Sequence, residues 1–349
     1  MPRRVLICGY GAFGAQHAAA WRALGADIEL GIAEPGAGAR ARAAADGIAQ
    51  ARIAADPVAA IAGADIVDIV SPPATHFDLA MAALDAGKPV LLEKPAVASV
   101  AQADALMARL EDSGLPLQVG FILRMHPLVA RARQMLAGGA VGRPTLMEGR
   151  FAGWKRRFRA VSLLENDGLH IIDLMRLFAG RPISRIGARA IGRFRGTGYD
   201  DLALDLTFGD DLPARLGLGM LAPGAADDPF APGARTDKYL RVVGEAGTLT
   251  LDFNANRLEL RPVRFEEDEA IVRPLPGEPV VETVENVTPQ SLLAAGFARF
   301  LEAVDGRSPV MVPPRWAVCD LARLVEALPA AIDRAALAEI EIARGGRAA

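Results

Sequence analysis

Three glycines near the N-terminus have the spacing G-x-G-x-x-G, after the apolar run 5–8 and before a helical pattern. In a dinucleotide-binding turn the first glycine permits the tight turn, the second lets the backbone approach a pyrophosphate, and the third lets helix and strand pack closely. The helix N-terminus then offers free N–H groups to the anion. The residues of this predicted site are Gly9, Gly11, Ala12, Phe13 and Gly14, and His17 is expected to pack beneath them.

Glu34 ends the next apolar run and is the candidate for ribose recognition. An acid at the tip of the second strand can accept both ribose hydroxyls and repels a 2'-phosphate, which favours NAD over NADP. Arg40 and Arg42 follow, so NADP stays open as the alternative cofactor. A second interpretation is that Glu34 caps the turn that begins at Pro35.

Short apolar runs alternate with helical patterns through residues 1–123, which predicts a parallel sheet built from βαβ units. Strands are expected at 5–8, 28–33, 51–53, 66–70, 89–92 and 117–121, and helices at 15–24, 37–46, 77–86 and 99–112. The fold class is therefore α/β, with an N-terminal Rossmann dinucleotide-binding domain over 1–123.

Beyond Arg143 the pattern changes to successive strands without helices between them, which indicates an open, predominantly antiparallel sheet covered on one face. Strands are expected at 145–151, 183–191, 202–208, 215–220, 239–243, 248–252 and 257–261, a loop at 266–279, and helices at 290–304 and 314–333. Residues 124–349 are thus predicted to form an α+β domain for substrate binding and oligomerisation.

Composition excludes several classes of protein. The 349 residues carry a net charge of -3, which gives no reason to expect nucleic acid or an anionic membrane as a partner. Cys8 and Cys319 are too few for a disulfide framework or a zinc cluster, so no metal site is expected. No apolar run approaches the roughly 20 residues of a membrane helix. A soluble, cytoplasmic protein is predicted.

Further motifs follow the glycine turn in order along the chain. They are Ser71-Pro72-Pro73-Ala74-Thr75-His76, Glu93-Lys94-Pro95, Gly168-x-His170-x-x-Asp173 and Gly244-x-x-Gly247-Thr248. Together they resemble the Gfo/Idh/MocA oxidoreductase family, named after glucose-fructose oxidoreductase and inositol dehydrogenase. The resemblance implies a nicotinamide cofactor across the carboxyl ends of the parallel strands, bordered by Ser71, Pro72, Pro73, His76, Glu93 and Lys94.

The resemblance also implies that Lys94 and His170 are the catalytic residues. A lysine at the end of a parallel strand lies where open α/β sheets bind ligands, and burial there can lower its pKa. Imidazole has the unperturbed pKa best suited to proton exchange near neutrality. An ordinary surface lysine and a structural histidine are the alternatives, whereas Asp173 is expected to brace the helix.

The chain departs from the family pattern four residues before His170. Polyol and sugar dehydrogenases of the family commonly carry Asp there, whereas this chain has Asn166 followed by Asp167, and Asn cannot take a proton. Three interpretations follow: Lys94 and His170 manage the proton alone, Asp167 substitutes through a shifted backbone, or the substrate is not a simple polyol. We favour the first interpretation, and we expect the side chains of Asn166 and Asp167 to contact the substrate.

Four cations lie in the six residues 154–159. Lys155 and its neighbours can bind a carboxylate or phosphate, and Trp154 can stack on a sugar face. A solvated loop or a subunit contact is an equal alternative. Arg124, which follows the last strand of the first domain, can enter the same site.

The predicted function is NAD(P)-dependent hydride transfer between nicotinamide and a carbinol or carbonyl carbon of a sugar, polyol or related cyclic compound. Two alternatives stay open. One is reduction of an imine, a conjugated double bond or an amino- or keto-sugar intermediate. The other is a non-catalytic dinucleotide-binding regulatory protein. A homodimer or homotetramer is expected through the strands of the C-terminal sheet, 202–220 and 239–261.

Overall fold

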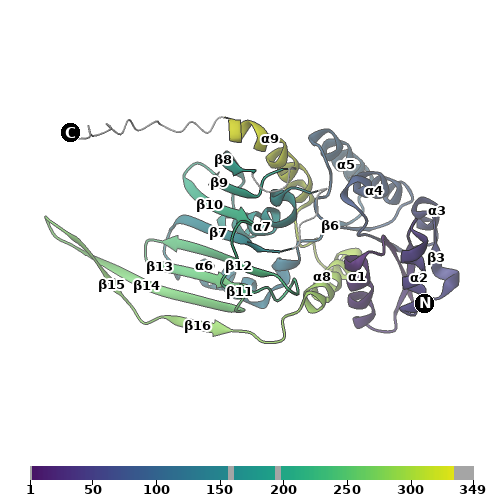
Figure 1. The fold of residues 1–349 in the computed structure, drawn as a ribbon, viewed down its shortest axis with the longest axis horizontal. Coiled ribbons are helices and arrows are strands. Elements are labelled where there is room, and N and C mark those ends of the chain that lie inside the picture. Colours follow the sequence, from purple (N-terminus) through teal and green to yellow (C-terminus); the bar gives the residue numbers. More distant parts are fainter. Residues whose placement is uncertain (1, 156–160, 193–197, 334–349) are drawn as a thin grey trace, which may run out of the picture.

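The computed structural model describes residues 2–155, 161–192 and 198–333, which form two sheets lying side by side with helices around them (Figure 1). The first sheet has six strands in the order β3-β2-β1-β4-β5-β6, all paired in parallel. They are β1 (Arg3–Cys8), β2 (Ile28–Ala33), β3 (Ile53–Ala54), β4 (Ile66–Ile69), β5 (Val90–Leu92) and β6 (Leu117–Val119). This order is that of the Rossmann fold, and it confirms the predicted parallel sheet.

Helices connect these strands on both faces, as parallel pairing requires. They are α1 (Ala12–Ala23), α2 (Ala37–Ala45), α3 (Pro57–Ile61), α4 (His76–Asp85) and α5 (Val100–Ser113), with single turns η1 (Gln50–Arg52), η2 (Pro73–Thr75) and η3 (Ile122–Met125). Ser99 caps the start of α5, and Gly114 ends it with a left-handed φ of 64°. Helix α3 was not predicted because its five residues are too short for a periodic pattern.

The second sheet is mixed and mainly antiparallel, with the order β15-β14-β13-β12-β7-β10-β9-β8. Its strands are β7 (Pro144–Trp154), β8 (Ile183–Ile191), β9 (Asp201–Phe208), β10 (Leu212–Gly219), β11 (Ala226–Asp227), β12 (Arg235–Gly244), β13 (Gly247–Asp252), β14 (Arg257–Glu267), β15 (Val272–Pro276) and β16 (Val280–Thr283). Strands β7 and β10 pair in parallel at its centre. The predicted fold class is confirmed.

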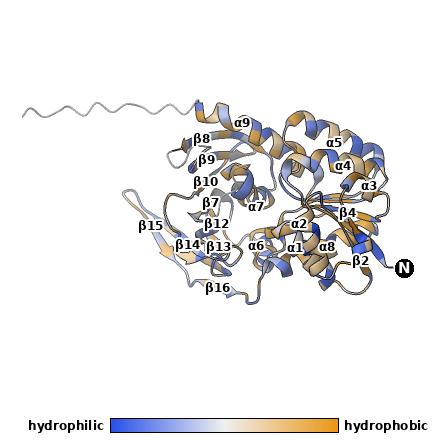
Figure 2. Ribbon diagram, turned by 45° about the vertical axis from the view of Figure 1, so that its right-hand side comes forward, coloured by the Kyte–Doolittle hydropathy of each residue, from blue (hydrophilic) through white to orange (hydrophobic). Residues whose placement is uncertain are grey.

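One face of the second sheet is covered by α6 (Pro127–Ala137) and α7 (Leu169–Ala179) (Figure 2). Helix α7 packs closely against β7 because Gly149 has no side chain. A Cβ atom at Gly149 would lie 2.6 Å from Ile171 and 2.8 Å from Met175. Helix α7 also contacts η3, the turn that follows β6 of the first sheet.

The stretch 266–279 was predicted to be a loop, and that prediction is wrong. Strands β14 and β15 form a hairpin that projects from the sheet, with Glu267 paired to Val272 (Figure 1). Phe265 and Val272 on this hairpin are exposed. Because neither face of the hairpin is buried, its sequence lacks the alternation by which a half-buried strand is recognised.

The chain returns to the first sheet near its end. Helix α8 (Pro289–Val304) packs against α1, with Phe297 stacked on Trp21 at 4.5 Å between ring centroids. Helix α9 (Leu321–Asp333) follows the π-helical turn η5 (Arg315–Asp320) and contacts both α5 and β8. Helix α8 thus covers part of the first sheet's unit, and α9 links α5 of that unit to β8 of the second sheet.

Candidate functional site

The glycine turn after β1 has the geometry that a bound dinucleotide needs. Gly9 has a left-handed φ of 103°, and a Cβ there would lie 2.7 Å from Ser71. A Cβ at Gly14 would collide with the Gly9 carbonyl oxygen, whereas one at Gly11 would meet nothing within 4 Å. No side chain caps the start of α1, so its N–H groups are available to an anion. The open space at Gly11 fits close approach of a pyrophosphate.

Glu34 stands at the tip of β2, beside this turn. One carboxylate oxygen accepts a hydrogen bond from the Tyr10 N–H and the other from the Gly36 N–H, each at 2.8 Å. The Gly36 contact is the predicted cap of the turn, and the Tyr10 contact holds the carboxylate next to the glycine turn. The guanidinium groups of Arg40 and Arg42 bind main-chain carbonyl oxygens of the same region.

His76 joins the two loops that follow β4 and β5. Its Nδ1 lies 2.8 Å from the Pro95 carbonyl oxygen and its Nε2 lies 2.8 Å from the Ser71 carbonyl oxygen. The ring is buried, with 1% of its surface exposed. The cofactor contact of His76 stays a prediction, and the ring joins Ser71 to the segment that follows Lys94.

His17 belongs to a buried network of charges under the glycine turn. Its Nδ1 lies 2.9 Å from the Asp68 carboxylate, which also accepts a hydrogen bond from Trp21, and its Nε2 lies 3.6 Å from Glu93. Burial opposes protonation, but the two carboxylates outweigh it and raise the pKa of His17 to about 9. His17 is therefore an imidazolium at neutral pH, and more than the packing residue we predicted.

Glu93 connects this network to the candidate catalytic lysine. Its side chain accepts a hydrogen bond from the Lys94 N–H at 3.1 Å. A Cβ at Gly120 would overlap the Glu93 carboxylate, so the neighbouring strand leaves room for that side chain. Glu93 thus orients the main chain at Lys94 from beneath.

Lys94 follows β5 and reaches across to the second unit. Its Nζ donates to the carbonyl oxygen of Asn166 at 2.7 Å and lies 3.4 Å from that of Glu165. Both carbonyls belong to the π-helical turn η4 (Leu164–Gly168), which leads directly into α7. Burial lowers the pKa of Lys94, and the carboxylates of Glu93, Asp167 and Glu165 oppose that shift. π-Helical turns of this kind are frequent at functional sites.

His170 lies in the first turn of α7, with its ring edge-on to Phe121 at 6.3 Å. Its Nδ1 is buried and has no hydrogen-bond partner among the described residues. Burial, followed by the ammonium groups of Lys94 and Lys238, holds the pKa of His170 well below its ordinary value. The ring is therefore neutral at pH 7 and can accept a proton. The effect of the Lys94 ammonium on this pKa indicates that the two predicted catalytic side chains lie near one another.

Asp167 takes part in a separate contact beside this pair. Its carboxylate lies 2.8 Å from the Lys155 Nζ and accepts a hydrogen bond from the Asn166 side chain at 2.8 Å. Both ends of the Lys155 ion pair are largely buried, with 8% and 3% of the side chains exposed. A hydrogen bond therefore links the side chains of Asn166 and Asp167 at the predicted site.

Lys238 is a residue that sequence reasoning missed. It lies on β12 opposite Phe151, with its Nζ 2.8 Å from the Asp228 carboxylate and 4.4 Å from the centre of the Phe151 ring. The rarity of lysine could have pointed to Lys238, because the chain has lysine only at 88, 94, 155 and 238. Three of these four converge on the site.

Two predicted substrate-binding residues have other contacts. The Arg124 guanidinium forms a bidentate ion pair with Asp173 at 2.6 and 2.7 Å, and Asp173 also accepts from Trp316. Trp154 is the last residue of β7, and its side chain is 56% exposed. The predicted cations 156, 157 and 159 lie outside the described residues.

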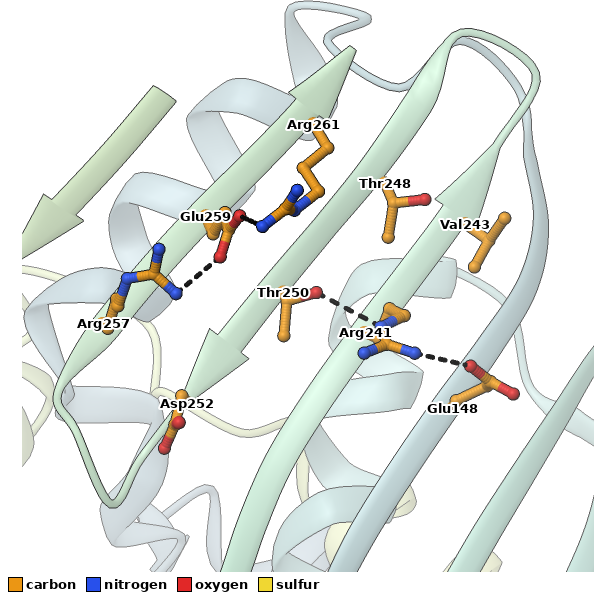
Figure 3. A pocket seen from close by; sticks show the side chains of 9 residues that line it. All are labelled: Glu148, Arg241, Val243, Thr248, Thr250, Asp252, Arg257, Glu259 and Arg261. Atoms are coloured by element: carbon orange, nitrogen blue, oxygen red, sulfur yellow. Dashed lines mark hydrogen bonds and ion pairs between the residues drawn. The ribbon is translucent and has the colours of Figure 1, made fainter. Parts of the chain in front are cut away.

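A cavity of about 480 Å³ lies elsewhere, on the uncovered face of the second sheet (Figure 3). Arg241 lies 3.3 Å from Glu148 there, and Arg257 and Arg261 both contact Glu259. Its lining is mainly charged and paired. Within residues 2–155, 161–192 and 198–333, no group of His, Cys, Asp and Glu has the arrangement of a metal site, and no helix is long and apolar enough to cross a membrane.

Known proteins resemble this chain in both sequence and structure. Its alignment with UDP-N-acetylglucosamine 3-dehydrogenase of Acidithiobacillus ferrooxidans shows 29% identity over 77% of this chain and 80% of that protein. Inositol 2-dehydrogenase of Mycolicibacterium gilvum is 30% identical over 52% of this chain and 54% of that protein. The chain thus spans about half the length of that inositol dehydrogenase.

Solved structures share the fold across nearly the whole chain. The UDP-N-acetylglucosamine 3-dehydrogenase structure from Acidithiobacillus ferrooxidans superposes with a TM-score of 0.76 at 24% identity, covering 96% of this chain and 100% of that one. An inositol dehydrogenase homologue from Azotobacter vinelandii, complexed with NADH and myo-inositol, has a TM-score of 0.76 at 20% identity, with 96% of each chain covered. At such identities the likeness shows the fold alone.

Family-level sequence models identify both halves of the chain. Residues 3–121 match the GFO_IDH_MocA oxidoreductase family with its NAD-binding Rossmann fold, and residues 129–250 match the GFO/IDH/MocA C-terminal domain. These matches agree with the glycine turn and with the order of strands in the two sheets. The chain belongs to the Gfo/Idh/MocA family of NAD-binding oxidoreductases.

Proposed function

We propose that this protein is an NAD-dependent dehydrogenase or reductase that acts on a carbinol or carbonyl carbon of a sugar, polyol or related cyclic compound. The observation that carries the proposal is the hydrogen bond that joins Lys94, at the end of β5, to the turn immediately before α7, whose first turn carries His170. Relatives named inositol 2-dehydrogenase and UDP-N-acetylglucosamine 3-dehydrogenase support a substrate of this class.

Nicotinamide supplies or accepts the hydride when the cofactor is bound. We assign the pyrophosphate to Gly9, Gly11, Ala12, Phe13 and Gly14, and the adenosine ribose to Glu34. Ser71, Pro72, Pro73, His76 and Glu93 form or brace the border of the site near the nicotinamide. In this proposal these residues bind and orient the cofactor and take no part in proton transfer.

Lys94 and His170 handle the proton in this proposal. In oxidation, the buried Lys94 ammonium donates a hydrogen bond to the substrate hydroxyl, and the neutral imidazole of His170 accepts the hydroxyl proton. In reduction the same proton path runs in reverse: Lys94 donates a hydrogen bond to the carbonyl oxygen, and His170 passes a proton to that oxygen and is neutral again afterwards. Because the His170 pKa is lowered, its neutral form persists well below pH 6.5, and oxidation should retain its base there.

The experiment that tests the proposal is a substrate panel followed at 340 nm with NAD or NADH. We expect turnover with at least one sugar, inositol, sugar acid or keto-sugar. Binding of NADH without any substrate-dependent change in absorbance would favour the non-catalytic alternative. Asn166, which stands where the family commonly carries Asp, is the reason for that alternative. Activity confined to imines or conjugated double bonds would favour the other reductase chemistry.

We also propose that the protein works in the cytoplasm as a homodimer or homotetramer. The uncovered face of the second sheet supports this assembly, because its strands present side chains of both charge signs that a second copy can match (Figure 3). Sedimentation velocity of the purified protein tests it, and a single monomeric species at micromolar concentration would contradict it.

A further inference from the structure

A row of buried charges leads from the middle of the Rossmann sheet to the proposed catalytic lysine. Asp68 lies on β4, and its carboxylate accepts a hydrogen bond from the Trp21 indole at 2.8 Å and lies 2.9 Å from the His17 Nδ1. On the other side of the ring, Nε2 faces the Glu93 carboxylate at 3.6 Å, as an ion pair and not as a hydrogen bond. Glu93 in turn accepts from the Lys94 N–H at 3.1 Å. The charges therefore alternate in sign along the row and end at Lys94.

The middle of this row is fixed by its surroundings. The His17 ring contacts the rings of Phe13 and Phe297, at 4.7 and 5.1 Å between centroids. The Glu93 carboxylate occupies space that a Cβ at Gly120 would fill. His17 is 1% exposed and Glu93 is 7% exposed, so water cannot take the place of the imidazolium as the partner of this carboxylate. A buried carboxylate is unfavourable without such a partner, and the ionised state of Glu93 thus depends on His17.

The titratable groups that act electrostatically with the Lys94 ammonium are Glu93, Glu165, Asp167 and His170. Burial lowers the pKa of Lys94, and Glu93 is first among the groups that oppose this shift. The other two carboxylates are engaged elsewhere, that of Glu165 by the Ser162 N–H and hydroxyl and that of Asp167 by the Lys155 ammonium. The charge of Glu93 is therefore the main support for the protonated form of Lys94.

We propose that His17 is a positioning residue for the proposed catalytic lysine: held by Asp68, its imidazolium keeps Glu93 ionised and in place, and Glu93 keeps Lys94 protonated. This inference rests on the proposed function and adds a control of the proton state on which that function depends. If the imidazolium is removed, the buried Glu93 carboxylate takes up a proton, because burial disfavours its charged form. Lys94 then loses the charge that most strongly opposes its deprotonation.

The titration of Lys94 can be measured directly because the chain has only four lysines. The full-length protein is labelled with lysine carrying ¹³C at Cε, and the signals are followed by NMR from about pH 6 to about pH 11, the range in which ammonium groups titrate. The variant Lys94→Arg identifies the Lys94 signal. In the unmodified protein we expect the Lys94 pKa to lie below its ordinary value of 10.5, because the group is buried.

Variants then test each step of the row. Glu93→Gln keeps the shape of the side chain and removes its charge, and should lower the Lys94 midpoint by about one pH unit or more. His17→Asn should shift the midpoint in the same direction, and so should Gly120→Ala, whose methyl group displaces the Glu93 carboxylate. His126→Asn is the matched control, since it removes another buried histidine, the cap of α6, and should leave the Lys94 midpoint unchanged.

A turnover measurement gives a second readout once a substrate is known. The alkaline limb of kcat, where Lys94 loses its proton, should move to lower pH in Glu93→Gln and His17→Asn, with the Km of the substrate changed much less. A purely structural role of His17 would lower the amount of folded protein and leave the position of this limb unchanged.

The possible results separate this proposal from the proposed function. A Lys94 midpoint that stays in place in Glu93→Gln or in His17→Asn overturns the role of the row. A rise of the midpoint in His17→Asn also overturns it, because the imidazolium would then act on Lys94 only by repulsion. If His17→Asn does not fold, Asp68→Asn removes the carboxylate that holds the imidazolium and provides the same comparison. A substrate panel without turnover overturns the proposed function alone, because the NMR titration needs no substrate.

Discussion

The Nζ atom of Lys94 lies 2.7 Å from the carbonyl oxygen of Asn166, and this hydrogen bond joins the carboxyl end of the Rossmann sheet to the turn before α7. The lysine comes from one unit and the carbonyl from the other. His170 follows Asn166 by four residues, in the first turn of α7, so this contact links the two segments that carry the proposed catalytic side chains. The relative position of the two sheets is therefore part of the proposed site.

Lys94→Ala should reduce kcat by about 100-fold or more, because it removes a positioned group that binds the reacting oxygen. Affinity for NADH, measured by fluorescence titration, should change little. Lys88→Ala is the matched control, since it removes a lysine that precedes the start of β5, whereas Lys94 follows the end of that strand. Turnover by Lys94→Ala within threefold of the unmodified protein would reject the catalytic assignment.

Two glycines of the nucleotide turn should respond differently to the same change. Gly11→Ala has open space for its Cβ and should fold normally, but the added methyl group occupies the approach of the pyrophosphate and should weaken NADH binding strongly. Gly14→Ala pushes a Cβ into the Gly9 carbonyl and should lower the free energy of unfolding by about 1–3 kcal/mol. Urea unfolding and NADH titration separate the two effects, and a stable Gly14→Ala would show that the turn can relax.

Glu34→Ala should weaken NADH binding more than NADPH binding. The carboxylate beside the glycine turn is placed to accept ribose hydroxyls and to repel a 2'-phosphate. Parallel titrations of the two cofactors measure the ratio of their dissociation constants. If the unmodified protein already binds NADPH more tightly, the ribose assignment is wrong and Arg40 becomes the residue to examine.

Asp167→Asn should reduce kcat by less than about tenfold, because the proposal gives the proton to His170 and not to this carboxylate. It should lower thermal stability, since the buried Lys155 ammonium loses its ion-pair partner. A loss of kcat near 100-fold, with a bell-shaped pH profile changed on its acid side, would instead make Asp167 the substitute for the missing aspartate at position 166.

Stability should fall as the pH rises from about 6.5 to about 9. The folded pKa of His17 is about 9, above its ordinary value of 6.5, so its imidazolium stabilises the fold fully below 6.5 and loses that effect through 9. Urea unfolding at intervals across this range measures the slope. His17→Asn removes the titrating ring and should flatten the slope; an unchanged slope would assign the effect to other groups.

The local sequence was sufficient for features that depend on neighbouring residues. The glycine spacing and the alternation of apolar runs with helices predict the Rossmann sheet, because parallel strands buried on both faces must be apolar throughout. The family motifs name Lys94 and His170 as the catalytic residues, and that assignment stays a prediction. The Ser99 cap and Gly114 end of α5 are further signals that act within a few residues.

Contacts between distant segments were decided only by the tertiary structure. Pairing of β7 with β12 places Lys238 opposite Phe151, and no local pattern encodes that register. The fold places Asp173 against the guanidinium of Arg124, a partner that the sequence did not indicate. The exposed β14–β15 hairpin lacks the burial that makes a strand periodic. Periodicity reports which face of an element is buried, whereas the partners of a buried charge depend on which elements meet.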